Sequence, residues 1–236
     1  MSLKIEKIKT NKSKIKLRPY MEQGIIPKHP FRCILNSISG GGKTTLLMNL
    51  MTKPQFYKGY FDETYIYSPT IGVDDSFEDL HIDEDHILSN LDDLRAVIDI
   101  QKQALKKKPI HKVAKVLIIF EDMQSSTKVL NNPDFVKLYL MGRHFSISTF
   151  FTSQHFKKTP KAVRSQATDL FLFQGNENER RLIIEEFTPP MKGFTKKDMI
   201  DLMDYVFDKP YNFMYINMTQ PFKTRYRKNL GEILEL

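Results

Sequence analysis

The sequence contains little that would place it outside the cell or in a membrane. Cys33 is its single cysteine, so no disulfide can form within the chain and a reducing, intracellular setting is expected. It has no run of about 18 apolar residues, the length that a membrane-spanning helix needs. The lysine-rich start has no apolar stretch ahead of a cleavage site, so we expect no signal peptide. No internal repeat or low-complexity linker divides the 236 residues, a length that can bury one full core.

The positive charge is concentrated at the N-terminus. Residues 1–19 hold seven lysines and arginines against Glu6 alone, which accounts for +6 of the net charge of +8. Such a segment suits the phosphates of a nucleic acid or an acidic partner surface. A solvated arm without a partner explains it equally well.

Short apolar runs that alternate with helical patterns predict an α/β fold. Runs that are apolar or β-branched throughout are typical of parallel strands buried on both faces. Ser89 with Asp92, and Thr195 with Asp198, have the spacing of helix start signals. We therefore expect an α/β sandwich with strands at 32–38, 64–68, 115–120, 147–153, 170–174 and 212–218.

The stretch SISGGGKTT at residues 37–45 predicts a phosphate-binding loop. The three glycines at 40–42 allow successive backbone N–H groups to turn toward a polyphosphate, and Lys43 can reach its β and γ oxygens. The hydroxyl of Thr44 can hold Mg²⁺ at the start of the following helix. Ser37 stands where the usual GxxxxGK(S/T) pattern has glycine, so a flexible glycine turn before a lysine is the competing interpretation.

Two adjacent carboxylates end a later apolar run, VLIIFED. The carboxyl end of a strand in an open parallel sheet is where ligands bind. We assign Glu121 to the metal and Asp122 to the activation of the attacking water. The order of the two acids is the reverse of the commoner Asp-Glu order, so their roles could be exchanged.

Gln154 ends the next predicted strand, ISTFFTSQ. If this strand lies between the P-loop strand and the acid strand, the amide of Gln154 can sense the γ-phosphate or position the attacking water. An inserted strand of this kind distinguishes motor-type P-loop ATPases from kinases and GTPases. The sequence also has no Asn-Lys-x-Asp motif of GTPases and no LSGGQ-like signature of ABC proteins. A loop amide with no catalytic role is the alternative for Gln154.

These motifs, with GRH at 142–144 and PKAVR at 160–164, resemble in order and spacing the genome-packaging ATPases of large DNA viruses and virophages, in the FtsK/HerA group. The resemblance covers roughly residues 30–175. It implies a RecA-like P-loop NTPase with a mostly parallel sheet, which uses ATP and Mg²⁺. It also implies a homo-oligomeric ring that moves double-stranded DNA into a viral capsid or portal vertex, in the virus factory of the infected host cytoplasm or associated with the virion.

From the charge pattern and the motifs we expect residues 1–20 to form a basic arm and 21–236 the ATPase domain, with 176–236 as a candidate C-terminal subregion. The resemblance assigns roles to individual residues. Arg143 and Arg164 are the two candidates for an arginine that completes the ATP site of a neighbouring subunit, and each could instead pair with a surface carboxylate. The nucleotide-binding residues are Ser39, Gly40, Gly41, Gly42, Lys43, Thr44 and Thr45, the metal ligands Thr44 and Glu121, and the catalytic residues Glu121, Asp122, Gln154, Arg143 and Arg164.

Two other functions remain open from the sequence alone. A P-loop module that binds nucleotide as a switch or scaffold, without sustained turnover, would suit the unusual Ser37 and the Glu-Asp order. A nucleoside or nucleotide kinase would need an acceptor pocket and an arginine-rich lid, and the sequence has no compact lid. Stimulation of ATP hydrolysis by duplex DNA would separate a motor from a switch.

Overall fold

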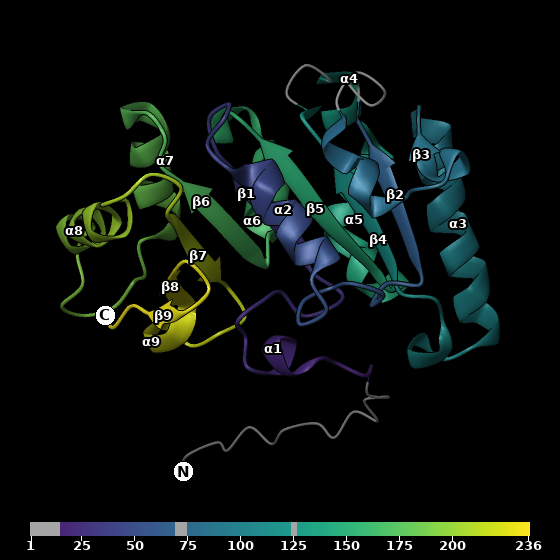
Figure 1. Ribbon diagram of the computed structural model, residues 1–236, viewed down its shortest axis with the longest axis horizontal. Coiled ribbons are helices and arrows are strands. Elements are labelled where there is room, and N and C mark those ends of the chain that lie inside the picture. Colours follow the sequence, from purple (N-terminus) through teal and green to yellow (C-terminus); the bar gives the residue numbers. More distant parts are fainter. Residues whose placement is uncertain (1–14, 69–74, 124–126) are drawn as a thin grey trace, which may run out of the picture.

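The computed structural model describes residues 15–68, 75–123 and 127–236. Most of the predicted basic arm, residues 1–14, lies outside them. The described residues form a nine-stranded sheet with the order β3-β2-β4-β5-β1-β6-β7-β8-β9, shown in Figure 1. None of the described helices is long and apolar enough to cross a membrane.

The five predicted parallel strands are all present, so the predicted α/β fold is confirmed. β5 pairs with β4 on one side and with β1 on the other, all in parallel, and β1 continues to β6. The inserted strand expected from the motifs is therefore β5. The bounds are β1 (Arg32–Asn36), β2 (Glu63–Tyr67), β4 (Val116–Phe120), β5 (Ile147–Ser153) and β6 (Asp169–Phe173).

Shorter strands extend both sides of this parallel core. On the side of β2, the two-residue strand β3 (Ile87–Leu88) runs parallel to it. On the side of β6, β7 (Phe213–Asn217), β8 (Tyr226–Lys228) and β9 (Glu232–Ile233) follow in antiparallel order. The strand predicted at 212–218 is β7. The C-terminal strands thus belong to the same sheet as β1, the strand that precedes the P-loop.

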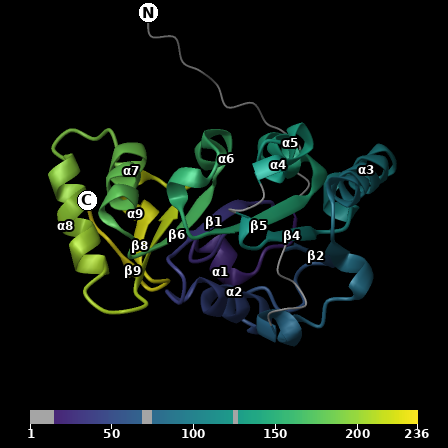
Figure 2. The same cartoon turned by 90° about the horizontal axis from the view of Figure 1, so that it is seen from above.

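Helices cover both faces of the sheet. Figure 2 shows α2 on one face and α5, α6 and α7 on the other. The helices are α1 (Pro19–Glu22), α2 (Lys43–Thr52), α3 (Leu91–Lys107), α4 (Thr127–Leu130), α5 (Pro133–Met141), α6 (Lys161–Gln166), α7 (Glu177–Phe187), α8 (Lys196–Val206) and α9 (Phe222–Arg225). Short 3-10 helices occupy Asp75–Leu80, Glu84–His86, Ile110–Lys112, Gly142–Phe145 and Phe156–Lys158.

Alternate side chains of each central strand enter two separate hydrophobic clusters. In β1, Ile34 packs into the cluster on the α5 and α6 face, whereas Cys33 and Leu35 pack against α2. Both clusters are fully buried at these positions. Burial on both faces explains why these strands do not alternate between apolar and charged residues.

The two predicted helix starts are found, one of them shifted by a residue. Thr195 and Asp198 form the capping box of α8 as predicted. The cap of α3 is formed by Asn90 with Asp93, not by Ser89 with Asp92. Asn90 accepts hydrogen bonds from two backbone N–H groups of the first turn, which a serine one residue earlier cannot reach.

The segment before β1 is held to the core by Arg18. Its guanidinium donates to three backbone carbonyls, of Pro54, Phe56 and Lys58, and stacks 5.6 Å from the ring centroid of Tyr60. Arg18 therefore serves the fold, although the sequence grouped it with the cations of the basic arm.

Candidate functional site

The predicted motifs converge at the carboxyl edge of the parallel strands. The P-loop follows β1, the acid pair follows β4, and Gln154 follows β5, which lies between them. Parallel pairing aligns the ends of these strands, with Asn36 opposite Ser153 and Phe120 opposite Phe151. The three elements predicted to act on one nucleotide are therefore neighbours at one edge of the sheet.

The P-loop has the backbone that a phosphate cradle needs. Gly42, the N-cap of α2, has φ 101°, and Gly40 has φ 71°, conformations that favour glycine. Gly41 is required for a different reason, because a Cβ there would lie 2.0 Å from Ser37 Oγ. Ser37, which replaces the first glycine of the usual P-loop pattern, is fully buried. Its side chain is therefore packed in the interior beside the loop.

Lys43 is a buried cation at the first position of α2. The residue as a whole is 8% exposed. Within the described part of the chain its ammonium group makes no ion pair or hydrogen bond. A cation without a partner among the described residues, beside a glycine loop and the first turn of a helix, is suited to an anion bound against the loop.

The acid pair is held by a threonine that sequence reasoning missed. Thr152 Oγ1 donates to Glu121 Oε2 at 2.5 Å and accepts from the backbone N–H of Asp122 at 3.0 Å. Glu121 is 7% exposed, while Asp122 is half-buried and has φ 46°, a conformation uncommon outside glycine. This backbone turns the two consecutive carboxylates to different environments, as different roles would require.

Gln154 is joined to the second carboxylate. Its Nε2 donates to Asp122 Oδ1 over 3.2 Å. The carboxyl ends of β5 and β4 are thus linked through side chains as well as through strand pairing. This hydrogen bond brings Gln154 to the acid pair, as its position at the end of the predicted strand suggested.

A pocket of about 560 Å³ opens beside the P-loop. Such a volume is typical of small-ligand sites. It extends from the loop toward the ends of β6 and β7, away from the acid pair. Its lining consists of residues 40–46, Asn49, Phe173, Tyr211 and Phe213.

A second pocket of about 610 Å³ lies at the opposite edge of the sheet, where β4 begins. Lys16, Arg18, Lys112 and Lys115 make its lining basic. It contains none of the predicted site residues, and the pocket at the P-loop remains the one with the chemistry of a nucleotide site.

Thr44 and Glu121 are the residues that could hold Mg²⁺. This ion usually binds proteins through one or two carboxylates and completes its shell with phosphate oxygens and water. Among residues 15–68, 75–123 and 127–236, no group of three or more His, Cys, Asp or Glu side chains forms a metal cage. One hydroxyl at the start of α2 and one carboxylate at the end of β4 fit a metal that arrives with a nucleotide.

The two candidate arginines differ in their surroundings. Arg164 in α6 forms a two-pronged ion pair with Glu186, with Nη2 2.6 Å from Oε1 and Nε 2.9 Å from Oε2. It also lies 5.5 Å from the ring centroid of Phe156. Arg143 is exposed, and its Nε donates to Nε2 of the neighbouring His144 over 3.3 Å. It precedes β5, so it lies at the opposite edge from the P-loop of its own chain.

A profile of the family described as Poxvirus A32 protein matches residues 21–219. The chain belongs to this family. The viral family resemblance inferred from the motifs is thereby confirmed.

Relatives of this A32-family chain include proteins called DNA packaging protein OPG160. Those of vaccinia virus (strain Western Reserve) and monkeypox virus are each 26% identical to it over 184 residues. These residues make up 76% of the chain, 65% of the vaccinia protein and 58% of the monkeypox protein. The match thus covers less than two thirds of the relatives' own length.

Solved structures share the fold of this A32-family protein. The genome packaging NTPase B204 from Sulfolobus turreted icosahedral virus 2, in complex with ATP-gammaS, matches with a TM-score of 0.56 at 16% identity, over 86% of this chain and 98% of that one. EccC from Thermomonospora curvata (ATPases 2 and 3) matches with a TM-score of 0.52 at 10% identity, over 88% of this chain and 37% of that one. At such identities the likeness establishes the P-loop NTPase fold alone.

Sequence reasoning missed two residues that lie at the site of this A32-family protein, Thr152 and Tyr211. Thr152 lies two positions before Gln154, in a strand that also contains Ser148, Thr149 and Ser153, so its polarity alone did not single it out. Tyr211 is next to Pro210 in a turn and has no helical or strand periodicity. Its place beside the P-loop depends on the antiparallel return of β7, which only the three-dimensional structure reveals.

Proposed function

We propose that this A32-family protein hydrolyses ATP with Mg²⁺ and uses the energy to move double-stranded DNA into a viral capsid. The observation that carries the proposal is the ammonium of Lys43, which pairs with no described side chain and follows a glycine loop at the same sheet edge as Glu121 and Asp122. Family membership and the names of its relatives, DNA packaging proteins, support the choice of DNA as the moved substrate.

Each residue at the edge has a role in this proposal. Lys43 neutralises the β and γ oxygens, and the amides of residues 40–44 cradle them. Glu121, held by Thr152, orients the metal, which stabilises charge on the phosphates. Asp122, held by Gln154, accepts a proton from the attacking water. These roles follow from position, and the exchange of roles between the two acids is tested below.

The proposal includes a ring of identical subunits. Arg143 is exposed at the edge opposite its own P-loop, so it can reach a nucleotide only in another subunit. Arg164 is engaged by Glu186 in its own chain, which favours Arg143 for this role. We place the ring at the capsid or portal vertex in the virus factory, as its relatives' packaging function suggests.

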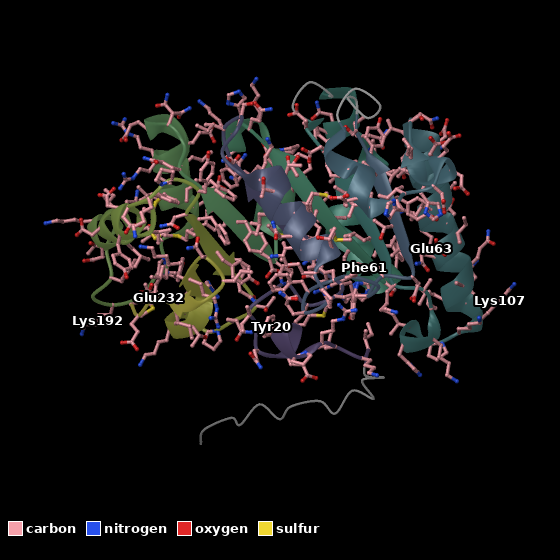
Figure 3. The ribbon with its side chains drawn as sticks, in the orientation of Figure 1. Tyr20, Phe61, Glu63, Lys107, Lys192 and Glu232 are labelled. Atoms are coloured by element: carbon pink, nitrogen blue, oxygen red, sulfur yellow. The ribbon has the colours of Figure 1, made fainter. Side chains whose placement is uncertain are left out.

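The test is ATP turnover with and without duplex DNA, for the wild type and Lys43→Ala. We expect turnover that DNA stimulates in the wild type and loss of turnover in the variant, with an unchanged circular dichroism spectrum. Lys192→Ala is the matched control, since Lys192 is an exposed lysine on the outer side of the C-terminal region (Figure 3).

Two results would change the proposal. Normal hydrolysis by folded Lys43→Ala would remove the P-loop assignment. Binding of ATP that depends on Lys43, with no sustained turnover in the presence of DNA, would favour the nucleotide switch or scaffold instead.

A further inference from the structure

We propose that Tyr211 is the stacking platform for the purine base of the bound nucleotide. This inference rests on the proposed function, since it needs the triphosphate to lie in the P-loop. The phosphate motifs do not say where the base of the nucleotide binds. The proposal assigns the base-binding part of the site to the turn between α8 and β7.

The direction of the bound nucleotide follows from the sheet order. Its γ-phosphate must face the acid pair, which ends β4, two strands to one side of β1. The nucleoside must therefore leave the P-loop toward the other side, where β6 and β7 lie. β7 is antiparallel to β6, so the start of β7 and the end of β6 meet at the P-loop edge, with Phe213 opposite Phe173.

The pocket on that side is lined by aromatic rings. Phe173 and Phe213 are buried, and their ring centroids lie 5.2 Å apart. The ring of Tyr211 lies next to the P-loop. A Cβ built on Gly42 would be 3.3 Å from Tyr211 Cδ1 and 3.4 Å from Phe173 Cε1. A ligand that enters the P-loop from this side passes directly over the tyrosine.

Tyr211 is also the residue whose conformation the fold does not explain. It is 70% exposed, the largest exposed fraction among the big apolar side chains of the described residues. Its φ of 66° lies in the left-handed region, which costs a non-glycine residue about 1–2 kcal/mol. An exposed aromatic ring kept in an unfavourable conformation beside a ligand pocket is typical of a binding residue rather than of packing. A flat ring offers a purine base a stacking surface.

The absence of tryptophan from the sequence allows a direct test. Tyr211→Trp creates a protein with one tryptophan, whose fluorescence we expect to fall when the non-hydrolysable analogue AMPPCP binds with Mg²⁺, and to stay unchanged with tripolyphosphate. Tyr20→Trp is the matched control, because Tyr20 is a partly exposed tyrosine in α1, on the far side of the molecule from the P-loop edge (Figure 3). An AMPPCP response equal to that of tripolyphosphate would overturn the proposal.

A second variant measures the contribution of the ring to affinity. Tyr211→Gly removes the ring and suits the positive φ, so we expect no fall in melting temperature, whereas a purely structural ring would leave the variant less stable. We expect the Kd of AMPPCP to rise about 5- to 150-fold, the usual range for loss of one base–aromatic stack, and the Kd of tripolyphosphate to stay within about twofold. Tyr211→Phe keeps the ring and should retain wild-type affinity.

The outcomes distinguish a failure of the Tyr211 platform from a failure of the proposed ATPase function. If AMPPCP binds in a Lys43-dependent way and Tyr211→Gly binds it as tightly as the wild type, the platform is wrong and the P-loop stands. If neither AMPPCP nor tripolyphosphate binding depends on Lys43, both proposals are wrong.

Discussion

Ser37 Oγ lies 2.0 Å from the position that a Cβ on Gly41 would occupy. The two residues are therefore coupled: the serine that replaces the first glycine of the usual P-loop pattern is accommodated only because Gly41 has no side chain. Gly41 has no positive φ, so its need for glycine comes from this contact and not from its backbone.

This coupling predicts a rescue. Gly41→Ala should lower ATP turnover about 100-fold, the loss that a displacement of about 1 Å can cause at a reacting centre. Ser37→Gly should remain active, and the double variant should recover much of the lost turnover, because the obstructing hydroxyl is gone. Steady-state ATP hydrolysis of the four proteins measures this. A folded double variant as inactive as Gly41→Ala would show that Ser37 is not the obstacle.

The acid pair predicts two different defects. Asp122→Asn should keep binding of Mg²⁺-ATP but lower kcat by about 10²- to 10⁴-fold, as expected for loss of a general base. Glu121→Gln should weaken nucleotide binding only where it depends on Mg²⁺. Titration calorimetry with and without Mg²⁺, together with turnover, separates the two. The control is Glu63→Gln, a partly exposed carboxylate at the start of β2 (Figure 3).

The opposite pattern would mean that the metal and base roles are exchanged between Glu121 and Asp122. If both variants hydrolyse ATP at the wild-type rate, the end of β4 has no part in catalysis.

Arg164 is predicted to stabilise the fold. Its side chain is 10% exposed and its ion pair with Glu186 joins α6 to α7. Arg164→Ala should lower the free energy of unfolding by about 1.5–3 kcal/mol, the range for hydrogen bonds to charged groups. Urea unfolding measures this change. An Arg164→Ala protein as stable as the wild type, yet unable to hydrolyse ATP, would return Arg164 to the catalytic candidates.

His29 predicts a loss of stability in mild acid. Its Nδ1 lies 2.7 Å from Ser148 Oγ and its Nε2 3.0 Å from Ser146 Oγ. Burial, and then the charge of Lys115, lower the pKa of His29 from 6.5 to about 3. The unfolded chain therefore binds the extra proton between these values, and stability falls as the pH falls below about 6.5.

The expected loss from His29 is about 2 kcal/mol between about pH 6.5 and pH 5. Burial raises the pKa of Asp169 from 3.8 to about 6, which stabilises the fold as the pH falls through the same range and masks part of the loss. His29→Gln isolates the histidine, because the variant should lose about 2 kcal/mol less than the wild type over this interval. Urea unfolding of both proteins at the two pH values measures this difference. If the wild type and His29→Gln lose the same stability, His29 is not the group responsible.

Much of the fold could be predicted from the sequence because its strands are buried on both faces. Such strands are continuous apolar runs, and each of the five lies within two residues of its predicted bounds at either end. The short strands β3, β8 and β9 were not predicted, since two or three residues give no periodicity to read. Asn90 was passed over as the cap of α3 because Ser89 and Asp92 have the same spacing as the true pair.

The candidate site divides in the same way. The P-loop and the acid pair carry their chemistry in adjacent residues, so local sequence reveals them. Thr152 and Tyr211 act through partners that are far apart in the chain, and their roles depend on strand register. Propensity and spacing contain no information about which strand lies next to which, so residues of this second kind appear only in the structure.

The last prediction is that Arg143 acts on the ATP of a neighbouring subunit. The P-loop edge of one chain presents Lys43 to the phosphates, and an arginine supplied in trans is worth about 10³ to 10⁵ in rate in related NTPases. Arg143 is exposed at the opposite edge of the sheet, so in a ring it can face the P-loop edge of the next subunit. Arg143→Ala should therefore bind ATP normally and hydrolyse it poorly.

Mixing two inactive proteins tests the action in trans. Arg143→Ala subunits have an intact P-loop and Lys43→Ala subunits have an intact arginine, so some interfaces of a mixed ring join the two intact halves and should recover part of the activity. The control is each inactive variant alone at the same total concentration. Lys192→Ala cannot serve in these mixtures, because it is expected to be active by itself. Absence of recovery in mixtures that sedimentation shows to be co-assembled would exclude Arg143 from the trans site. A fully active monomer would reject the ring, since one chain cannot bring Arg143 to its own nucleotide.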